Sequence, residues 1–546
     1  MSVDRRLSKV RAGSDQPGRE AAAPRPWWQT ATALACVLAL IRILLVVISP
    51  YHRAVGLFDD DAFYYFGIAR NIAEGHGSTF NGLDTTNGYH PLWLLVLMPI
   101  FAVTRGHAAL VAVTLVSSLV FVASARLVDR LGTATGRPIL FTVSAVPLFV
   151  LGTSGPSYWY SGMETGLLLL SLLALAVIYT ESEGFRATWF GPKHALTAGL
   201  VVIVVVFCRL DAVIPMAVLG VVAVIGWFRS GRGWMRSAVC FLGPGAICLT
   251  VYMVFNERLF GTPLPVSGQA KALGGAGLNP QPIRQFLTEP TLFGQHTFLG
   301  AFCMAIAVGL MFSRPRGRIA DAARFGTIVL IGGVLTVVYY AVTSSWTLWP
   351  WYFYAAPLAS ALMLPALIAS PTARVRMPMR RILIGAIVLS TVLVAAANAV
   401  RAAQGTTRSA FVEVAPEVAA AVDSLRPLGA PIAMGDRAGS LGFHMNRPLV
   451  HLEGLVNSST YLEALRGGTV AEFLGYRGVG LYARGDTSPG EPDRAHSGCR
   501  RFTEPAQGAG VKSVIVVCDS DLLLDRRIED GTSYQVWRYR PELNTN

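Results

Sequence analysis

Charged side chains are scarce in this sequence. Asp, Glu, Lys and Arg make up 14% of its 546 residues, whereas soluble domains carry about 25%. Hydrophobic residues make up 53%, and the mean hydropathy is +0.47. Such a composition excludes a wholly soluble protein. We expect a polytopic α-helical membrane protein with a soluble part.

Familiar catalytic motifs are missing as well. The chain contains no P-loop, no G-x-G-x-x-G, no H-E-x-x-H, no G-x-S-x-G and no Cys/His spacing typical of a metal centre. The sequence therefore gives no sign of a nucleotide-binding loop, a zinc peptidase or a serine hydrolase. We predict no organic cofactor, and the participation of a divalent cation stays open.

Twelve apolar runs divide the first 400 residues. They lie at 30–49, 91–104, 108–125, 138–152, 165–179, 195–208, 212–228, 237–256, 294–312, 325–345, 351–370 and 382–400. The run at 91–104 would form a helix of roughly 21 Å, which is shorter than the hydrocarbon core of about 30 Å. We expect this run to be only partly inserted, or to begin one bent span, and therefore predict about eleven transmembrane helices.

The net charge of +13 does not indicate a nucleic-acid partner, because the basic residues fall in short loops between the apolar runs. Loops rich in Lys and Arg face the cytoplasm. This rule predicts a cytoplasmic basic tail at 1–29 and a transmembrane domain at 30–401, with a first outer loop at 50–90. It also places the carboxyl end outside, so the protein is expected to be a multi-pass protein of the cell membrane.

The remaining part, 402–546, has shorter apolar runs and predicts an extracytoplasmic α/β domain. Strands are expected at 430–434, 448–452, 513–518 and 534–539, helices at 414–425 and 459–466, and a flexible loop at 484–509. Cys499 and Cys518 would form a disulfide in an oxidising compartment. We expect this domain to support the site or bind the acceptor, with Asp436 and Glu453 as its best candidates for a role.

The first outer loop carries three adjacent carboxylates, Asp59, Asp60 and Asp61, immediately before an aromatic-rich segment. An Asp at this position caps a helix, and the helix dipole favours its ionised form. We expect the helix to run from Ala62 to Glu74 and to lie in the membrane interface. An ordinary capped helix is the alternative to a functional site.

Further polar and aromatic residues are expected on the outer side. Arg209 and Asp211 interrupt an apolar stretch, and ionisable pairs at membrane depth are either functional or paired with each other. Lys271 suits a phosphate as a point charge. Trp346 and Trp349 belong either to an aromatic belt or to a surface that stacks on a sugar. The other candidate substrate-binding residues are Asn87, Tyr89, His90 and Glu164, beside Asp59.

This set of residues predicts chemistry on a lipid-linked substrate. An ionised Asp can deprotonate an acceptor hydroxyl that attacks an activated carbon while a lipid phosphate leaves. Arg209 or Lys271 would offset the charge that develops on the phosphate. The catalytic candidates are Asp60 and Asp61. We predict Asp60 as the base, because it directly precedes the expected helix, and a positioning or ion-binding role for Asp61.

The segment DDAFYYFGIARNIAEGHGSTFNGLDTTNGYHPLW (60–93) resembles the first outer loop of the GT-C superfamily of membrane glycosyltransferases. Together with SGMET, RLDA, FGTPLPVSGQAK and the GDRAGSLGF run, it is most similar to the branch of the mycobacterial cell-wall arabinofuranosyltransferases. The resemblance implies a polyprenyl-phosphate sugar donor, a cell-envelope glycan or glycolipid acceptor, an outward site among membrane lipids and a first-loop Asp as base. A transporter or flippase of lipid-linked sugars is the alternative, although internal repeats are not evident.

Overall fold

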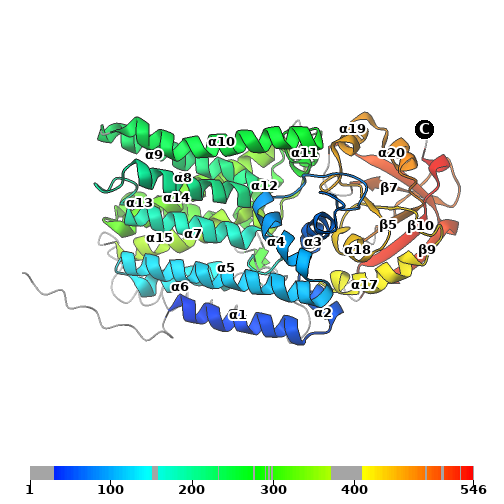
Figure 1. The fold of residues 1–546 in the computed structure, drawn as a ribbon, viewed down its shortest axis with the longest axis horizontal. Helices are drawn as coiled ribbons and strands as arrows, with labels where there is room; N and C mark the ends of the chain where they lie inside the picture. The colour runs from blue at the N-terminus through cyan, green and yellow to red at the C-terminus, as the bar shows by residue number, and fades with distance from the viewer. Residues whose placement is uncertain are drawn as a thin grey trace, which may run out of the picture.

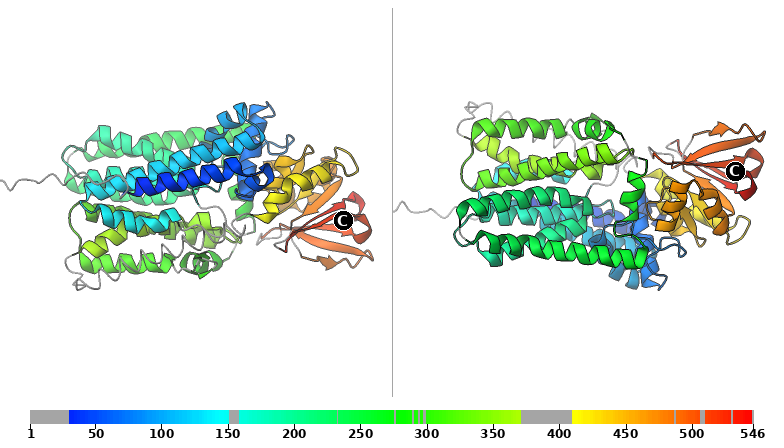
Figure 2. Two further views of the ribbon diagram at one scale, coloured as in Figure 1. Left: turned by 90° about the horizontal axis from the view of Figure 1, so that it is seen from below. Right: turned by 90° about the horizontal axis from the view of Figure 1, so that it is seen from above.

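A helical bundle and a C-terminal α/β region are arranged end to end (Figure 1, Figure 2). The structure is a computed structural model. It describes residues 30–150, 158–231, 233–274, 277–288, 290–292, 295–296, 299–370, 409–485, 488–505, 510–528 and 531–544. The predicted tail at 1–29, the run at 382–400 and the boundary at 402 lie outside the described residues.

Long helices run side by side along the bundle. They are α1 (Ala31–Ile48), α5 (Gly106–Ala134), α6 (Pro138–Val150), α7 (Thr165–Glu181), α8 (Pro192–Cys208), α9 (Val213–Ser230), α10 (Trp234–Phe260), α13 (Leu299–Ser313), α14 (Arg318–Thr343) and α15 (Ala355–Ala369). Shorter elements are α2 (Tyr51–Val55), α3 (Asp60–Ala73), α4 (Pro91–Val103), η2 (Leu210–Ala212), α11 (Val266–Ala272), α12 (Gln281–Thr288), β1 (Pro290–Leu292), β2 (Gln295–His296) and η3 (Pro350–Phe353).

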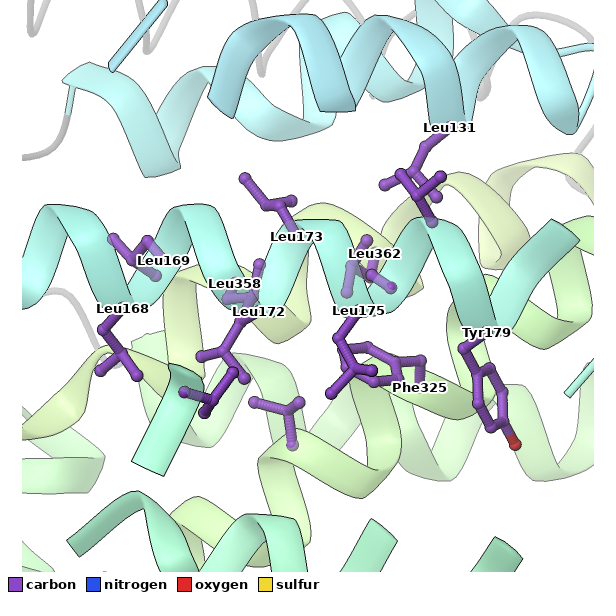
Figure 3. Close-up of a cluster of buried hydrophobic side chains, with 14 of the residues drawn as sticks. Leu131, Leu168, Leu169, Leu172, Leu173, Leu175, Tyr179, Phe325, Leu358 and Leu362 are labelled. Carbon is purple, nitrogen blue, oxygen red and sulfur yellow. The ribbon is translucent and has the colours of Figure 1, made fainter. Parts of the chain in front are cut away.

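The core of the bundle forms around α7, which is apolar on every side. Leu168, Leu172 and Leu175 are fully buried there, against Phe325 of α14 and Leu358 of α15 (Figure 3). A helix that is hydrophobic all round belongs in the interior. By contrast, α10 leaves most of its apolar side chains exposed, as expected for a helix that faces lipid.

Six helical segments of the described chain are long and apolar enough to cross a membrane. They are Ala31–Ile48, Gly106–Ala134, Leu210–Ser230, Trp234–Phe260, Arg318–Thr343 and Pro350–Ala369. Shorter apolar helices accompany them at Pro91–Val103, Thr165–Glu181, Pro192–Cys208 and Gly300–Ser313. The chain is thus a multi-pass membrane protein, and the count of eleven transmembrane helices stays a prediction.

The short run at 91–104 forms α4, which begins and ends at the same end of the bundle. Its first residue follows His90, which lies 3.8 Å from Glu164. Beyond its last turn, Arg105 forms an ion pair of 3.2 Å with Glu74, at the carboxyl end of α3. The chain then crosses the bundle through α5. This agrees with one net crossing over 91–125.

The C-terminal region contains a five-stranded sheet in the order β4-β3-β5-β10-β9 and a three-stranded sheet in the order β6-β7-β8. The strands β3 (Ile432–Met434), β4 (Leu449–His451) and β5 (Leu481–Arg484) are parallel, and β10 (Ser533–Arg538) is antiparallel to β5 and to β9 (Leu522–Arg527). Its helices are α17 (Ala410–Asp423), α18 (Gly439–His444), α19 (Ser459–Gly467), α20 (Val470–Tyr476), η4 (Asp519–Asp521) and η5 (Pro541–Leu543). All four predicted strands and both predicted helices are confirmed.

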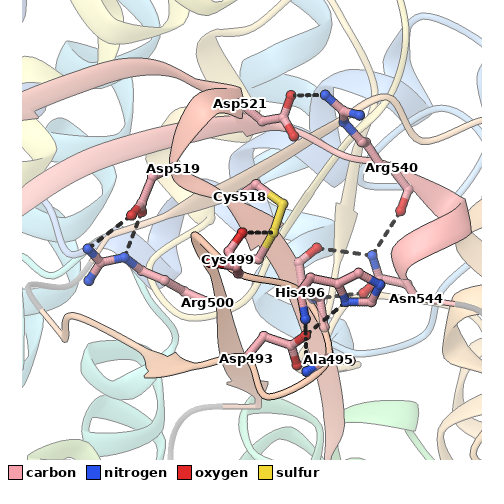
Figure 4. The surroundings of a disulfide bond; sticks show 12 residues. Asp493, Ala495, His496, Cys499, Arg500, Cys518, Asp519, Asp521, Arg540 and Asn544 are labelled. Atoms are coloured by element: carbon pink, nitrogen blue, oxygen red, sulfur yellow. Dashed lines mark hydrogen bonds and ion pairs between the residues drawn. A yellow bond between two sulfur atoms is a disulfide. The ribbon is translucent and has the colours of Figure 1, made fainter.

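The expectation of a flexible loop at 484–509 is wrong for part of that segment. It contains β6 (Glu491–Pro492) and β7 (Cys499–Glu504), and β7 pairs along its whole length with β8 (Ser513–Cys518). The register sets Cys499 opposite Cys518, and the two form a disulfide (Figure 4). The sequence of β7, CRRFTE, has three charged residues and no regular alternation of apolar residues, so the strand could not be predicted from its hydrophobic pattern.

The helix α3 departs from the prediction that it lies in the membrane interface. It starts at Asp60, and Phe63, Phe66, Ile68 and Ala69 are all buried. One buried cluster joins these side chains to α4 and α5 on one side and to α17 and α18 on the other. The aromatic residues of α3 therefore bind the C-terminal domain to the bundle instead of facing lipid.

Candidate active site

Two adjoining cavities lie where the bundle meets the C-terminal domain. The larger has a volume of about 270 Å³ and the smaller about 80 Å³. Both are lined by Asp61, Lys271, Trp351, Tyr352 and Leu455. An acidic and a basic side chain thus lie at the junction of the two cavities.

Asp60 is held by the C-terminal domain. Its Oδ2 accepts a hydrogen bond of 2.8 Å from the Gly439 amide, and its Oδ1 accepts one of 2.8 Å from the Ser440 amide and another from the Ser440 hydroxyl. A Cβ at Gly439 would lie 2.2 Å from the Asp60 carbonyl oxygen, so only glycine allows this approach. Both carboxylate oxygens of Asp60 are therefore occupied by hydrogen bonds from the first residues of α18.

Asp61 has different surroundings. It lines both cavities, and its carboxylate accepts no hydrogen bond from any residue that the structure describes. Burial raises the pKa of Asp61 to about 8, the charge of Asp60 adds to the effect, and Lys271 opposes it. Asp59, the N-cap residue of α3, lines only the larger cavity, and burial raises its pKa well above the ordinary value.

Lys271 is presented to the cavities by α11. Its Nζ donates a hydrogen bond to the Tyr352 hydroxyl and lies 5.1 Å from the centre of that ring. Burial lowers the pKa of Lys271, but the Tyr352 oxygen more than offsets this and raises it above the ordinary value. The ammonium group is therefore charged and has donor capacity left for a ligand.

Asn87 positions α11 from behind. Its Oδ1 accepts a hydrogen bond of 2.9 Å from the Val266 amide, and its Nδ2 donates to the Leu264 carbonyl at 3.3 Å. The residue is fully buried and lines neither cavity. Asn87 thus lies outside both cavities and holds the start of the Lys271 helix α11. Its predicted contact with the substrate stays a prediction.

The predicted charged pair forms a buried network. Arg209, which is 1% exposed, donates to Glu164 at 3.0 Å and to Asp211 at 2.9 Å. Tyr65 donates to Glu164 at 3.0 Å, and Tyr340 donates to Asp211 at 3.1 Å. Two carboxylates already balance the guanidinium, so Arg209 has less charge to offer a phosphate than Lys271 has.

Part of this network lines the smaller cavity. Arg209 and Glu164 line the cavity, whereas Asp211 lines neither. His90 lines it too, and its Nδ1 accepts a hydrogen bond of 3.2 Å from the Leu210 amide, which leaves the proton on Nε2, facing Glu164. Burial lowers the pKa of His90, so the ring is neutral. Tyr89, a further lining residue, pairs with the Ser78 hydroxyl at 2.9 Å.

Aromatic side chains from the segment after α14 line the larger cavity. Trp349 and Trp351 are stacked, with ring centres 5.6 Å apart and planes 10° apart. Trp346 is buried beside them, and Trp349 is 42% exposed. Their position at the cavity agrees with a surface that stacks on a sugar, and the aromatic belt stays the alternative.

The C-terminal domain supplies further lining residues: Asp436 and Glu453, which were predicted from the sequence as its best candidates for a role, and Arg437, which was not predicted. Asp436 and Arg437 follow β3, and Glu453 follows β4, where parallel strands end side by side. Glu453 is 4% exposed, and burial raises its pKa well above the ordinary value. In the sequence, the runs GDRAGSLGF and HLEGLVN contain these lining residues and were part of the resemblance to the glycosyltransferases. Their closeness to the Asp loop becomes visible only in the folded structure.

No group of three or more His, Cys, Asp or Glu side chains among the described residues is arranged to hold a metal ion. The participation of a divalent cation therefore has no support from the side-chain geometry, and it stays open.

Comparisons with known proteins give only distant similarities. No family model matches the chain, and no curated protein matches it. Among solved structures, it is similar to the archaeal oligosaccharyltransferase AglB from Archaeoglobus fulgidus in complex with an inhibitory peptide and a dolichol-phosphate, with 12% identity, 84% of this chain and 70% of that chain covered, and a TM-score of 0.46. A structure of the Archaeoglobus fulgidus oligosaccharyltransferase with Zn and sulfate is 14% identical, with 84% and 68% covered and a TM-score of 0.47.

Proposed function

We propose that this protein is a membrane glycosyltransferase that moves a sugar from a polyprenyl-phosphate donor to a hydroxyl of a cell-envelope glycan or glycolipid. The observation that carries the proposal is the position of Asp61 and Lys271, which line both cavities at their junction. A base and a cation at one point suit a reaction in which a proton leaves an acceptor and charge develops on a phosphate. The GT-C resemblance of the Asp loop supports the same reaction.

Each of the two residues has one task in this reaction. The acceptor hydroxyl loses its proton to the Asp61 carboxylate, and its oxygen forms a bond to the anomeric carbon of the donor. The bond from that carbon to the phosphate oxygen breaks, and its electron pair stays on the phosphate. The Lys271 ammonium stabilises the resulting charge. Asp61 later returns the proton to water.

Asp61 is proposed as the base in place of Asp60. Both oxygens of Asp60 accept hydrogen bonds from α18, so they are already occupied. Asp61 has no such bonds within the described structure, and it faces both cavities. Asp60 then takes the positioning role, the reverse of the assignment made from the sequence.

The smaller cavity is proposed to receive the donor phosphate. It lies on the bundle side of Lys271, among Tyr65, His90 and Arg209, where a lipid-linked phosphate would arrive from the membrane. The similarity of the Asp loop to the arabinofuranosyltransferase branch favours a cell-wall substrate. It does not select the sugar.

The test is the release of free polyprenyl phosphate when the purified protein meets a panel of polyprenyl-phosphate sugars and a mixed cell-envelope acceptor fraction. We expect release with at least one donor. Asp61→Asn should lower turnover by about 10²–10⁴-fold, because the amide keeps the shape but cannot take the proton. Lys271→Met should lower it as well.

A matched control is Asp525→Asn, which removes an exposed carboxylate from β9, outside both catalytic cavities. This variant should turn over donor at the normal rate. Absence of release with every donor would refute the proposed function. Full activity of Asp61→Asn beside an inactive Asp59→Asn would refute the choice of base.

A further inference from the structure

We propose that the larger cavity is an acceptor subsite that holds one uncharged sugar ring, stacked on Trp349 and hydrogen-bonded by Glu453 and Asp436. This inference rests on the proposed function and adds to it the class of acceptor and the residues that select it. It also makes the C-terminal domain a part of the substrate-binding site.

The stacked tryptophans form the platform. Trp349 and Trp351 lie parallel, and Trp349 keeps 42% of its surface exposed although it lines a cavity. A large exposed aromatic ring beside several carboxylates is poorly placed for contact with lipid. It is well placed for the apolar face of a sugar ring, whose hydroxyls then point sideways to polar partners.

Glu453, like Asp61, is a carboxyl group of the cavity without a hydrogen bond from the described residues. It is only 4% exposed. His451 Nε2 lies 3.5 Å from the Glu453 carboxyl group and also pairs with the Tyr64 hydroxyl at 3.1 Å. Burial lowers the pKa of His451 to about 4, so the ring is neutral and does not balance a charge on Glu453. A buried carboxyl group without hydrogen bonds is costly, and a ligand hydroxyl would supply the missing bond.

The charge of the cavity selects against anions. Its lining carries five carboxyl groups, and the cations are Lys271 and Arg437. The carboxyl groups are Asp59, Asp60, Asp61, Asp436 and Glu453. Burial and mutual repulsion raise the pKa of Asp59, Asp61 and Glu453, so this cavity already disfavours negative charge. A uronic acid or a phosphorylated sugar would add charge to it, whereas neutral hydroxyls find hydrogen-bond partners on several sides.

The size of the cavity sets the length of the ligand. Its volume of about 270 Å³ is slightly below the range of pockets for drug-sized ligands, which begins near 300 Å³. One ring fits, with the rest of the glycan outside. A ring on Trp349 lies next to the junction with the smaller cavity, so one of its hydroxyls can reach Asp61.

The experiment measures binding and turnover with the full-length protein. Tryptophan fluorescence is followed while a neutral oligosaccharide is added, and again with an oligosaccharide of the same length that carries a uronic acid. We expect the neutral ligand to bind at least about tenfold more tightly. In turnover assays, Trp349→Ala and Glu453→Leu should each raise the acceptor KM about tenfold and leave the donor KM unchanged. Trp349→Tyr and Glu453→Gln should restore most of the affinity.

The matched control is Trp189→Ala, which removes an exposed tryptophan (52% exposed) that lines neither catalytic cavity. It should change neither KM. Equal binding of the acidic and neutral ligands, or an unchanged acceptor KM in both Trp349→Ala and Glu453→Leu, overturns this inference while polyprenyl phosphate release still supports the enzyme. Selective binding of the neutral glycan without any release supports the subsite and overturns the proposed transfer.

Discussion

Asp60 and Asp61 are neighbours in the chain, yet their surroundings are opposite. Adjacent residues at the start of a helix project in different directions, so one carboxylate of α3 points to the C-terminal domain and the other to the cavities. The Asp60 carboxylate accepts three hydrogen bonds from Gly439 and Ser440. Asp61 lines both cavities and accepts no hydrogen bond from the described residues, which is the basis for proposing it as the base.

The first prediction concerns the pH dependence of turnover. Burial, the charge of Asp60 and the charges of Glu453 and Asp436 raise the pKa of Asp61, and Lys271 lowers it, with a result of about 8. A general base acts only when deprotonated, so kcat/KM should rise with pH and level off above about 8. Asp60→Asn removes a neighbouring negative charge, which should shift the midpoint to lower pH.

The comparison for this shift is Asp436→Asn, because Asp436 is the weakest of the named influences on Asp61. It should move the midpoint less than Asp60→Asn does. The measurement is initial release of polyprenyl phosphate between pH 5.5 and about 9.5 at low donor concentration. A midpoint that both variants leave in place would contradict the role of Asp61.

The sequence pointed to this carboxylate triplet and predicted Asp60 as the base, whereas the hydrogen bonds that Asp60 accepts favour Asp61. The choice depends on α18, which lies nearly 380 residues away in the chain. Separations of 177 and 179 residues likewise hid the position of Asn87, since its partners Leu264 and Val266 lie at the start of α11. Residue types showed where chemistry is possible, and long-range contacts decided which atoms remain available.

At the scale of elements, α3 connects the two parts of the molecule. Tyr64 pairs with His451, Arg70 donates to the Phe443 carbonyl at 2.8 Å, and Asp60 joins α18. The loop after α3 adds an ion pair of Asp84 with Arg477. The Asp loop and the C-terminal domain are therefore packed as one unit around the larger cavity.

The second prediction tests this packing. Gly439→Ala places a Cβ 2.2 Å from the Asp60 carbonyl oxygen, and backbone on both sides prevents an easy adjustment. We expect α18 to move away, with a loss of about 1–3 kcal/mol of stability and a large loss of turnover. Thermal unfolding in detergent and the release assay measure the two effects.

Gly475 of α20 is the matched control. It is also a helical glycine, but an added Cβ would meet no atom within 4 Å. Gly475→Ala should be neutral or slightly stabilising, by up to about 1 kcal/mol. Equal unfolding temperatures for the Gly439 and Gly475 variants would show that the close approach to Asp60 does not matter.

The predictability of the elements followed their hydrophobic pattern. A continuous apolar run such as SVIVVC allowed the strand β8 to be predicted correctly. The strand β9, LLLDRR, lies at a sheet edge with much of its surface exposed, and α18 has six residues with two glycines. Neither has the periodicity that a sequence reading needs. The prediction that α3 is an amphipathic helix in the membrane interface was wrong, because the bundle covers one face of α3 and the C-terminal domain covers the other.

At the scale of the whole molecule, the bundle separates two ends of different character. The α5 helix starts at the cavity end, where His107 contacts the Val46 carbonyl, and its 29 residues extend over roughly 43 Å to the other end. There Arg130 and Arg318 line a shared depression. Basic residues gather on the cytoplasmic side, which favours an outward cavity end. The Cys499–Cys518 disulfide favours the same orientation for the C-terminal domain.

The last prediction is the orientation itself. Single cysteines are introduced at Leu83 in the first outer loop, at Tyr476 in the C-terminal domain, which is 83% exposed, and at the exposed Arg316 of the loop before α14. The background replaces the five free cysteines and keeps the disulfide. A membrane-impermeant maleimide should label the first two positions in intact cells, because both lie at the cavity end. It should label Arg316→Cys only after permeabilisation. Labelling of Leu83→Cys and Tyr476→Cys from opposite sides would contradict their packing around one site. Labelling of both only after permeabilisation would place the catalytic cavities on the cytoplasmic face and refute an outward-facing transferase.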